Sequence, residues 1–371
     1  MANTRILSKS AEYGIIRQPG TAEGANAFHC GGGQTSGWLN IPTAATNFRR
    51  VQYNKDSVIF DPMVTIEQYE SSGQNGIHDE TAQFFIDKLS GLPTMTFAMP
   101  ADQKTLAPHL VGALGVVSEA GTTPYAKTIT CNGLTGPVDF TATGSGAGIW
   151  PLHAVSMTDT GGSADDGKWI ENAIIDTLTL EFDFNAQGLA RLGQLSGTWV
   201  GDEINLEQTM SGTTVDTTLV PYNNTDLFNF STFTVDSQNW AALAFRRFSF
   251  TVNNNVTKDD ATTAGKASQY NVTPEYTSTI ILNYDATTEK VALDYQQGDL
   301  VVATFANASP STDGGLSIAG TKGQLMSQPE IYEGEYKGVQ LDVKWYANAA
   351  STPVTILVTD TQEWTYGDDG A

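Results

Sequence analysis

Charged residues are scarce in this chain, and basic residues are the scarcest. Of 371 residues, 41 are acidic and 19 are lysine or arginine, and the charged fraction of 16% lies below the roughly 25% usual for soluble domains. The net charge is −22, and no basic cluster exceeds the pairs Arg49-Arg50 and Arg246-Arg247. Because tight binding of nucleic acid needs basic patches that replace counterions on the phosphates, this charge composition argues against an ordinary DNA-binding protein. An acidic wall would instead repel phosphate and let DNA slide past.

Cysteines and long hydrophobic runs are also few. Cys30 and Cys131 are too few for a disulfide framework, and we expect both to be reduced, as in a protein that folds in a cytoplasm. No run reaches 18 apolar residues, which predicts the absence of a membrane span. The N-terminus opens onto polar sequence without the apolar core of a signal peptide.

The residue clusters that could be catalytic or metal-binding lack the spacing or the flanking sequence that such sites need. His29 adjoins Cys30, but neighbouring residues on a strand point to opposite faces and do not easily chelate one ion. The glycine-rich run 144–148 resembles a nucleophile elbow, yet Pro151 follows where that motif needs a helix. Paired aspartates such as Asp165-Asp166 lack the twelve-residue calcium loop. We predict no catalytic residue, metal or cofactor; an acid and base from distant segments would escape this search.

What the chain does have is a strong period of two. Short stretches alternate apolar and polar residues between turn-forming glycine, asparagine, aspartate and proline, which is typical of strands in a mainly β protein. The predicted strands are Ile174–Phe184 and Leu189–Val200, paired as a hairpin, and Phe245–Asn253, Tyr276–Tyr284, Leu300–Phe305, Val339–Ala347 and Pro353–Thr359. Two helices are predicted, one from Asp102 as N-cap to Gly115 and one from Thr287 or Thr288 to Gly298.

The order strand, long polar loop, strand, helix occurs twice, which suggests a tandem duplication. The first copy comprises Met63–Tyr69, Glu70–Glu80, Thr94–Met99 and the helix from Asp102; the second comprises Arg247–Asn253, Asn254–Ser268, Thr277–Asn283 and the helix from Thr287. A hairpin with a tryptophan, Trp199 or Trp345, ends each copy. The copies share essentially no identical residues, so the repeat rests on pattern alone. The predicted organisation is an arm at 1–40, a β domain at 41–206, a linker at 207–240 and a second β domain at 241–371.

The order of segments resembles the tail tube proteins of long-tailed bacteriophages. Three places carry the resemblance: Glu12-Tyr13-Gly14 through Ile16 with Gly20-Thr21, the hairpin from Ile174–Leu180 to Gly197–Gly201, and the strand Phe248–Asn253 that ends in the asparagine run to Asn255. The resemblance covers most of the chain, but its motifs are diffuse. It implies a β-sandwich or barrel with a short flanking helix and a long loop, duplicated here in tandem, whose inner sheets join between subunits into one barrel.

The resemblance further implies a structural virion protein, not an enzyme, that polymerises into stacked rings through which DNA passes into the host. Rings of three duplicated or six unduplicated copies would stack with themselves, and a tape-measure protein, a tail terminator and distal tail or baseplate proteins would be the other partners. The protein would lie in the virion tail after assembly in the host cytoplasm. Candidate inter-ring loop residues are Glu70, Gln74, Asn75, His78, Asp79, Asn254, Asn255, Lys258, Asp259 and Asp260. Candidate inner-sheet residues are Val64, Ile66, Phe97, Phe248, Phe250 and Ile281.

Two other classes stay open at this point. One is another virion β-protein, such as a capsid decoration or baseplate component, which would not polymerise into hollow rods. The other is a secreted adhesin or carbohydrate-binding module, which would need a signal sequence and a concentrated aromatic face; the aromatic residues here are scattered along the strands.

Overall fold

A computed structural model of the chain describes a large part of its 371 residues. The described residues are 11–17, 49–51, 53–54, 56–61, 65–68, 84–87, 93–121, 123–131, 136–139, 152–158, 165–201, 203–210, 220–222, 228–242, 244–258, 269–283, 299–327, 330–333, 336–347 and 352–361. Strands dominate them, with the α-helix α1 (Leu106–Leu114) and a 3₁₀ turn at Gly188–Arg191. The prediction of a mainly β fold with a short helix is confirmed.

The strands follow the alternation of the sequence closely. In chain order they are β1 (Ala11–Arg17), β2 (Arg49–Val51), β3 (Ile59–Asp61), β4 (Thr65–Gln68), β5 (Phe84–Asp87), β6 (Thr94–Pro100), β7 (Val116–Ala120), β8 (Tyr125–Thr130), β9 (Gly136–Asp139), β10 (Leu152–Thr158), β11 (Asp165–Asp183), β12 (Gln194–Val200), β13 (Glu203–Met210), β14 (Asn229–Val235), β15 (Gln238–Asn239), β16 (Phe245–Asn253), β17 (Thr257–Lys258), β18 (Gln269–Val272), β19 (Glu275–Asn283), β20 (Leu300–Ala306), β21 (Gly315–Ser327), β22 (Glu330–Glu333), β23 (Tyr336–Trp345) and β24 (Val354–Asp360).

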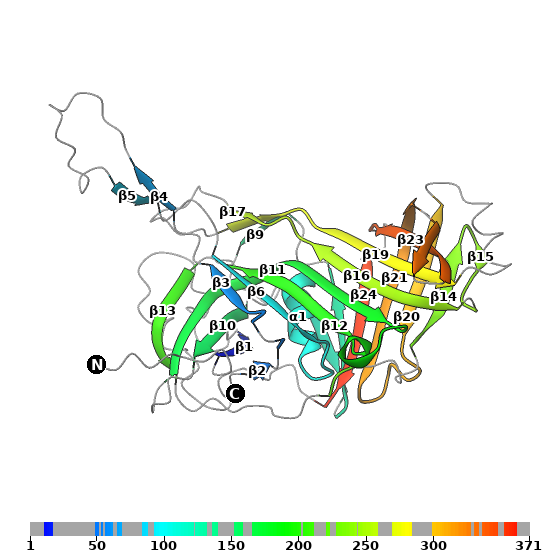
Figure 1. The fold of residues 1–371 in the computed structure, drawn as a ribbon, viewed down its shortest axis with the longest axis horizontal. Helices are drawn as coiled ribbons and strands as arrows, with labels where there is room; N and C mark the ends of the chain where they lie inside the picture. The colour runs from blue at the N-terminus through cyan, green and yellow to red at the C-terminus, as the bar shows by residue number, and fades with distance from the viewer. Residues whose placement is uncertain are drawn as a thin grey trace, which may run out of the picture.

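A central sheet runs through the body of the molecule, as Figure 1 shows. Its order is β3-β6-β12-β11-β16-β19-β23-β22, and every neighbouring pair is antiparallel. The predicted hairpin is confirmed as β11 and β12, with Leu180 opposite Leu195. Its return strand begins at Gln194, later than predicted, because residues 188–191 form the 3₁₀ turn, which Gly188 opens with a φ of 66°.

A second sheet faces the central sheet and encloses the core. Its order is β7-β8-β24-β21-β20-β14-β15. Phe248 of the central sheet stacks on Phe305 of the second sheet with ring centroids 4.1 Å apart, so the two inner faces interlock as in a β-sandwich. The long strand β21 joins the sheets, because its first half pairs with β24 and its second half with β23.

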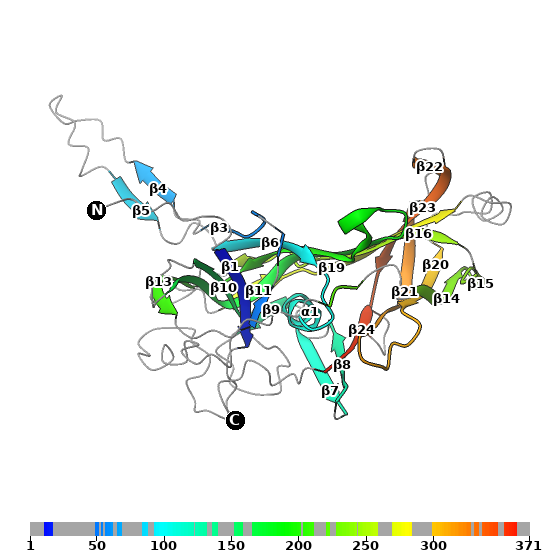
Figure 2. The same ribbon diagram turned by 60° about the horizontal axis from the view of Figure 1, so that its bottom comes forward.

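The 19-residue strand β11 also serves a third, lateral sheet. Its C-terminal half lies in the central sheet, while its N-terminal half pairs with β10 and β13. Strand β1 pairs with β10 on one side and β2 on the other, so the lateral sheet has the order β2-β1-β10-β11-β13. Figure 2 shows β13, β10 and β1 toward one end of the body, opposite the end that holds β14 and β15. The N-terminal strand is therefore part of the folded body.

The helix α1 packs against β11 and β8 between the sheets, with all nine of its residues buried. A helix that is buried on all sides needs apolar residues around its whole circumference. In α1 these residues are Leu106, Ala107, Leu110, Val111, Ala113 and Leu114. Its end at Gly115 is confirmed, where a φ of 97° lets the amide reach the Val111 carbonyl. The predicted start was wrong: the helix begins after Thr105, and Asp102 instead accepts hydrogen bonds from the amides of Lys104 and Val220.

Strands from before and after the predicted linker at 207–240 meet within both sheets, although each group stays together in the strand order. In the central sheet β11 pairs with β16, and in the second sheet β8 pairs with β24. The two predicted domains therefore share one core. The strand with Trp345 is part of a hairpin, since β23 pairs with the preceding β22, and β24 lies in the other sheet, where it pairs with β21 and β8. The second predicted helix, from Thr287 to Gly298, falls outside the described residues, and the tandem duplication stays a prediction.

Candidate functional site

Chemistry-bearing clusters are missing from the described part of the chain. No group of three or more histidine, cysteine, aspartate or glutamate residues gathers there in a way that would hold a metal ion. No helix among the described residues has the length and hydrophobicity to span a membrane. Three features of the described part bear on function: a buried polar network at the N-terminal strand, the polar outer face of the central sheet, and the exposed apolar margins of that sheet.

The buried network joins the N-terminal strand to the helix and the central sheet. The Trp199 indole Nε1 donates to the Tyr13 hydroxyl at 2.7 Å, and that hydroxyl lies 3.0 Å from His109 Nε2. His109 Nδ1 lies 2.7 Å from the Thr105 carbonyl, so Nδ1 carries the proton and Nε2 accepts from Tyr13. All three side chains are fully buried. Complete pairing in a dry interior makes this network a structural anchor for β1.

Acidification should test the anchor, because burial lowers the pKa of His109 from 6.5 to about 3. The unfolded chain takes up a proton below pH 6.5 that the folded chain refuses, so the histidine's contribution is complete above pH 6.5 and declines toward pH 3. We expect the unfolding free energy to fall by about 1.4 kcal/mol per pH unit from this residue. In urea titrations, His109→Gln should be less stable near neutrality yet decline less steeply on acidification. Parallel declines of both proteins would contradict the assignment.

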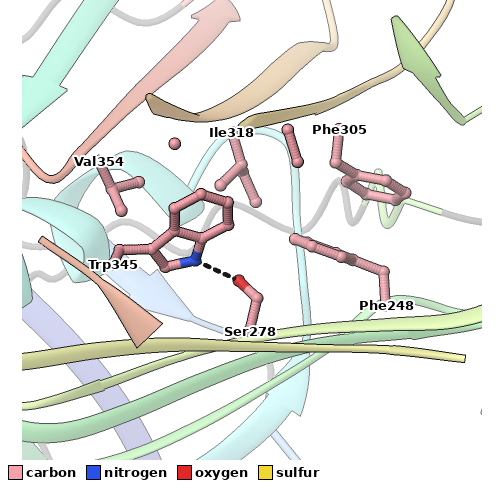
Figure 3. A pocket seen from close by; sticks show the side chains of 8 residues that line it. Phe248, Ser278, Phe305, Ile318, Trp345 and Val354 are labelled. Carbon is pink, nitrogen blue, oxygen red and sulfur yellow. Dashed lines mark hydrogen bonds between the residues drawn. The ribbon is translucent and has the colours of Figure 1, made fainter. Parts of the chain in front are cut away.

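A small gap lies in the core beneath Trp345. Its lining includes Phe248 and Ser278 of the central sheet and Phe305 and Ile318 of the second sheet, and the Trp345 indole donates to the Ser278 hydroxyl at 2.9 Å (Figure 3). The gap measures about 10 Å³, which is about the room that one water molecule needs. It is therefore a packing gap and not a ligand site.

The outer face of the central sheet is covered with hydroxyl groups. Inward positions of β11, such as Leu178 and Leu180, are buried, whereas the alternate positions Thr177 and Thr179 are half-exposed. The register continues this pattern across the sheet, and the Thr179 and Thr251 hydroxyls lie 3.2 Å apart. We call this surface the hydroxyl face; its uncharged members are Thr96, Thr177, Thr179, Gln194, Ser196, Thr198, Ser249, Thr251, Asn253, Thr277 and Thr279.

Charges on the described rows of the hydroxyl face are few and held by partners. Two of its cations form cross-strand ion pairs: Arg247 with Glu181 at 2.6 Å and Lys344 with Glu275 at 2.7 Å. The Glu275 carboxylate raises the pKa of Lys344 through their hydrogen bond, and Lys344 keeps its charge at neutral pH. The carboxylates remaining on these rows are those of Asp183 and Asp342. Asp61 on β3 and Arg246 at the end of β16 lie on the same face, which therefore carries more carboxylates than cations.

The two remaining carboxylates are anchored by hydrogen bonds. Asp342 accepts from the Thr279 hydroxyl at 2.9 Å and from Gln340 Nε2 at 3.0 Å. Asp183 Oδ1 accepts from the amides of Asn185 and Ala186 in the turn after β11. At the end of the face, the Arg246 side chain donates to Asn283 Oδ1. The ionised groups of the face are thus fixed in place.

The margins of the central sheet expose apolar side chains. Among the described strands, β3 pairs only with β6 at one margin, and β22 pairs only with β23 at the other. Ile59 on β3 is 60% exposed and Tyr332 on β22 is 75% exposed. Figures 1 and 2 both show the hairpin of β4 and β5 lying apart from the body at the end that holds β3. Its register places Ile66 opposite Ile86, and among described strands it pairs with no third strand.

Most of the candidate inner-sheet residues come together. Phe97 on β6, Phe248 and Phe250 on β16 and Ile281 on β19 lie in the central sheet, the three phenylalanines pointing into the sandwich. Ile66 does not join them, because among the described strands β4 pairs with β5 alone. Val64 lies outside the described residues.

Most of the candidate loop residues lie outside the described part of the chain, namely Glu70, Gln74, Asn75, His78, Asp79, Asp259 and Asp260. Lys258 falls in the short strand β17, which pairs with β18, and β18 in turn pairs with β9. Asn255 is exposed and its Nδ2 donates to the Thr273 carbonyl. The predicted loop from Asn254 to Ser268 therefore begins inside a small three-stranded sheet.

Asn254 was wrongly predicted as an exposed loop residue, because it is fully buried. Its Nδ2 donates to the carbonyls of Ala113 at 2.9 Å and Ile175 at 2.6 Å, and its amide donates to the Asp176 carbonyl. One side chain thereby ties the last turn of α1 to β11 and to the end of β16. The asparagine run following a β strand suggested a loop, and no sequence signal distinguished the buried position from its exposed neighbour.

Comparison with known proteins adds no relative: neither a protein-family model nor a curated protein matches the chain.

Proposed function

We propose that the chain is a structural virion protein that assembles into the tail tube of a long-tailed bacteriophage. The proposal rests on the sequence resemblance and, in the structure, on one observation: the central sheet ends at both margins in short strands that leave Ile59 and Tyr332 exposed. Exposed apolar sheet edges are a liability in a monomer. Pairing of the β3 margin of one copy with the β22 margin of the next buries both side chains and continues the sheet.

Such a contact is heterologous, since two different surfaces meet. Copies related by the same rotation at each contact form a closed ring. Eight strands spaced about 4.8 Å apart contribute about 38 Å of circumference per copy. Three copies give a barrel about 37 Å across between opposite backbones, and six copies one about 73 Å across. The narrower barrel leaves, after side chains are added, a bore suited to one DNA duplex, so the sheet width favours rings of three copies.

The projecting hairpin of β4 and β5 suits the contact between rings. An isolated two-stranded hairpin is marginally stable in water. It becomes stable when a neighbour covers one face, and the register sets Ile66 and Ile86 on the same face. The neighbour of fitting chemistry is a second copy in the next ring, so the hairpin would join rings along the tube axis.

Negative-stain microscopy of the purified protein tests the proposal. We expect hollow rods, and native mass measurement of an isolated ring should give three copies. Deleting residues 65–87 with a short glycine linker should leave rings and the far-ultraviolet circular dichroism intact while abolishing rods, because the hairpin contributes no strand to the described sheets of the body. Tyr332→Lys should instead stop ring closure.

Two outcomes would contradict the proposal. A wild-type protein that stays monomeric at every concentration and ionic strength would exclude a tube, and would favour a decoration or baseplate component. Rods of normal length from the hairpin deletion would show that rings stack through another segment.

A further inference from the structure

The hydroxyl face has the chemistry of a surface that lets a polyanion pass without holding it. Binding to DNA draws most of its free energy from lysine and arginine groups that replace counterions on phosphates. Arg247 and Lys344 lie within the face and Arg246 at its end, and all three are engaged: the Arg247 guanidinium with Glu181 at 2.6 Å, the Lys344 ammonium with Glu275 at 2.7 Å, and Arg246 with the side-chain oxygen of Asn283. Phosphate would have to displace a carboxylate to reach Arg247 or Lys344.

The glutamates therefore have a role that stability does not explain. Side chains exposed by 30% to 47% form ion pairs worth little to folding, typically below about 1 kcal/mol. Their effect on the potential of the face is larger, since removing both carboxylates would take away two negative charges and release two cations toward the solvent.

The opposite side of the sandwich differs. On the second sheet, outward positions of β8, β24, β21 and β20 such as Thr128, Leu357, Ser317 and Thr304 carry uncharged side chains, and β21 also exposes the cation Lys322. Such a face does not repel phosphate and contains apolar side chains that protein contacts would cover. The net negative charge and the masked cations distinguish the hydroxyl face from it.

We propose that the hydroxyl face lines the bore of the tube, and that Glu181 and Glu275 prevent passing DNA from binding by masking Arg247 and Lys344. This inference rests on the proposed function. Glu181 and Glu275 act through the cations and are positioning residues. The ligand class is a nucleic-acid backbone that touches the wall only transiently.

Unmasking the cations tests the inference. Rods of the double variant Glu181→Gln and Glu275→Gln should retain a short fluorescent DNA duplex on co-sedimentation at low salt, at least tenfold more than wild-type rods. Retention should fall steeply with salt, as counterion release requires. The matched control is Asp236→Asn with Asp313→Asn, two exposed carboxylates away from the face whose removal changes the net charge equally. Control rods should retain no more DNA than wild type.

A second measurement locates the face independently of DNA. In assembled rods, Thr251→Cys should react with a small maleimide but not with a large polyethylene-glycol maleimide, whereas both reagents should label the unassembled protein. Two results obtained with normal rods would overturn this inference and leave the proposed function standing. In one, the large reagent labels the Thr251→Cys rods; in the other, the glutamine variant retains no more DNA than its control. Failure of the wild-type chain to form rods would overturn the proposed function itself.

Discussion

Replacing Asp360 with leucine should lower the unfolding free energy by about 3–5 kcal/mol, the usual cost of leaving one charge of a buried pair behind. The Asp360 carboxylate at the end of β24 lies 2.5 Å from Lys127 Nζ on β8, and the two side chains are 1% and 2% exposed. Both occupy inward positions of the second sheet, where the neighbours Ile129 and Val358 are apolar. The Lys127 ammonium would lose this short ion pair in a position that is 2% exposed.

The control for this prediction removes both charges. Lys127→Met combined with Asp360→Leu should recover most of the loss, because apolar side chains of similar volume often replace a buried ion pair without cost. Urea unfolding of the wild type, the two single variants and the double variant gives the coupling energy. A double variant no more stable than Asp360→Leu would show that the pair is not the cause of the loss.

This ion pair also marks the limit of what the sequence predicted. The alternation of apolar and polar residues located most of the long strands, including β16 at its observed bounds, because a strand with one buried face must alternate. Lys127 and Asp360 are 233 residues apart, and only the pairing of β8 with β24 brings them together. No local pattern encodes which distant strands become neighbours.

The same reason explains why the remaining neighbours of each strand were not predicted. Trp199 and Trp345 each lie in a hairpin, β11–β12 and β22–β23, but nothing local indicated that β12 also pairs with β6, or that β23 also pairs with β19 and β21. Hydrophobic alternation fixes which residues face the core but leaves the partner strand open. The helix start moved from Asp102 to Thr105 because tertiary contacts with residue 220 occupied the carboxylate that was expected to cap it.

The candidate site shows the same division. The low content of lysine and arginine suggested a wall that would not bind DNA, and that prediction needs only the composition of the chain. The masking pairs Glu181–Arg247 and Glu275–Lys344 join neighbouring strands at diagonal positions, so they follow from register and were not visible in the sequence. Asn254 was missed for the complementary reason, because burial of its amide depends on the last turn of α1.

Truncating Trp345 should be the other large perturbation, at about 3–5 kcal/mol for Trp345→Ala. The indole extends from the central sheet onto Gly320 and Gly323 of β21, and a Cβ added at Gly320 would lie 2.4 Å from the ring. These glycines leave the space that the ring fills, and Figure 3 shows the ring between Val354, Ile318 and Ser278. Its removal would extend the existing gap of about 10 Å³ into a large apolar cavity between the sheets.

The variant Trp345→Phe separates packing from hydrogen bonding. It keeps an aromatic ring over the glycines but removes the indole donor to Ser278, so its loss should be smaller, about 1–2 kcal/mol. Thermal and urea unfolding measure both variants. Because Trp345 is an inward residue, folded Trp345→Phe should form rods that still release DNA, whereas the glutamine variants of the hydroxyl face should fold normally and retain it. If Trp345→Ala lowers the unfolding free energy by less than about 1 kcal/mol, the pairing of β21 with both sheets is enough to hold them together without the indole ring.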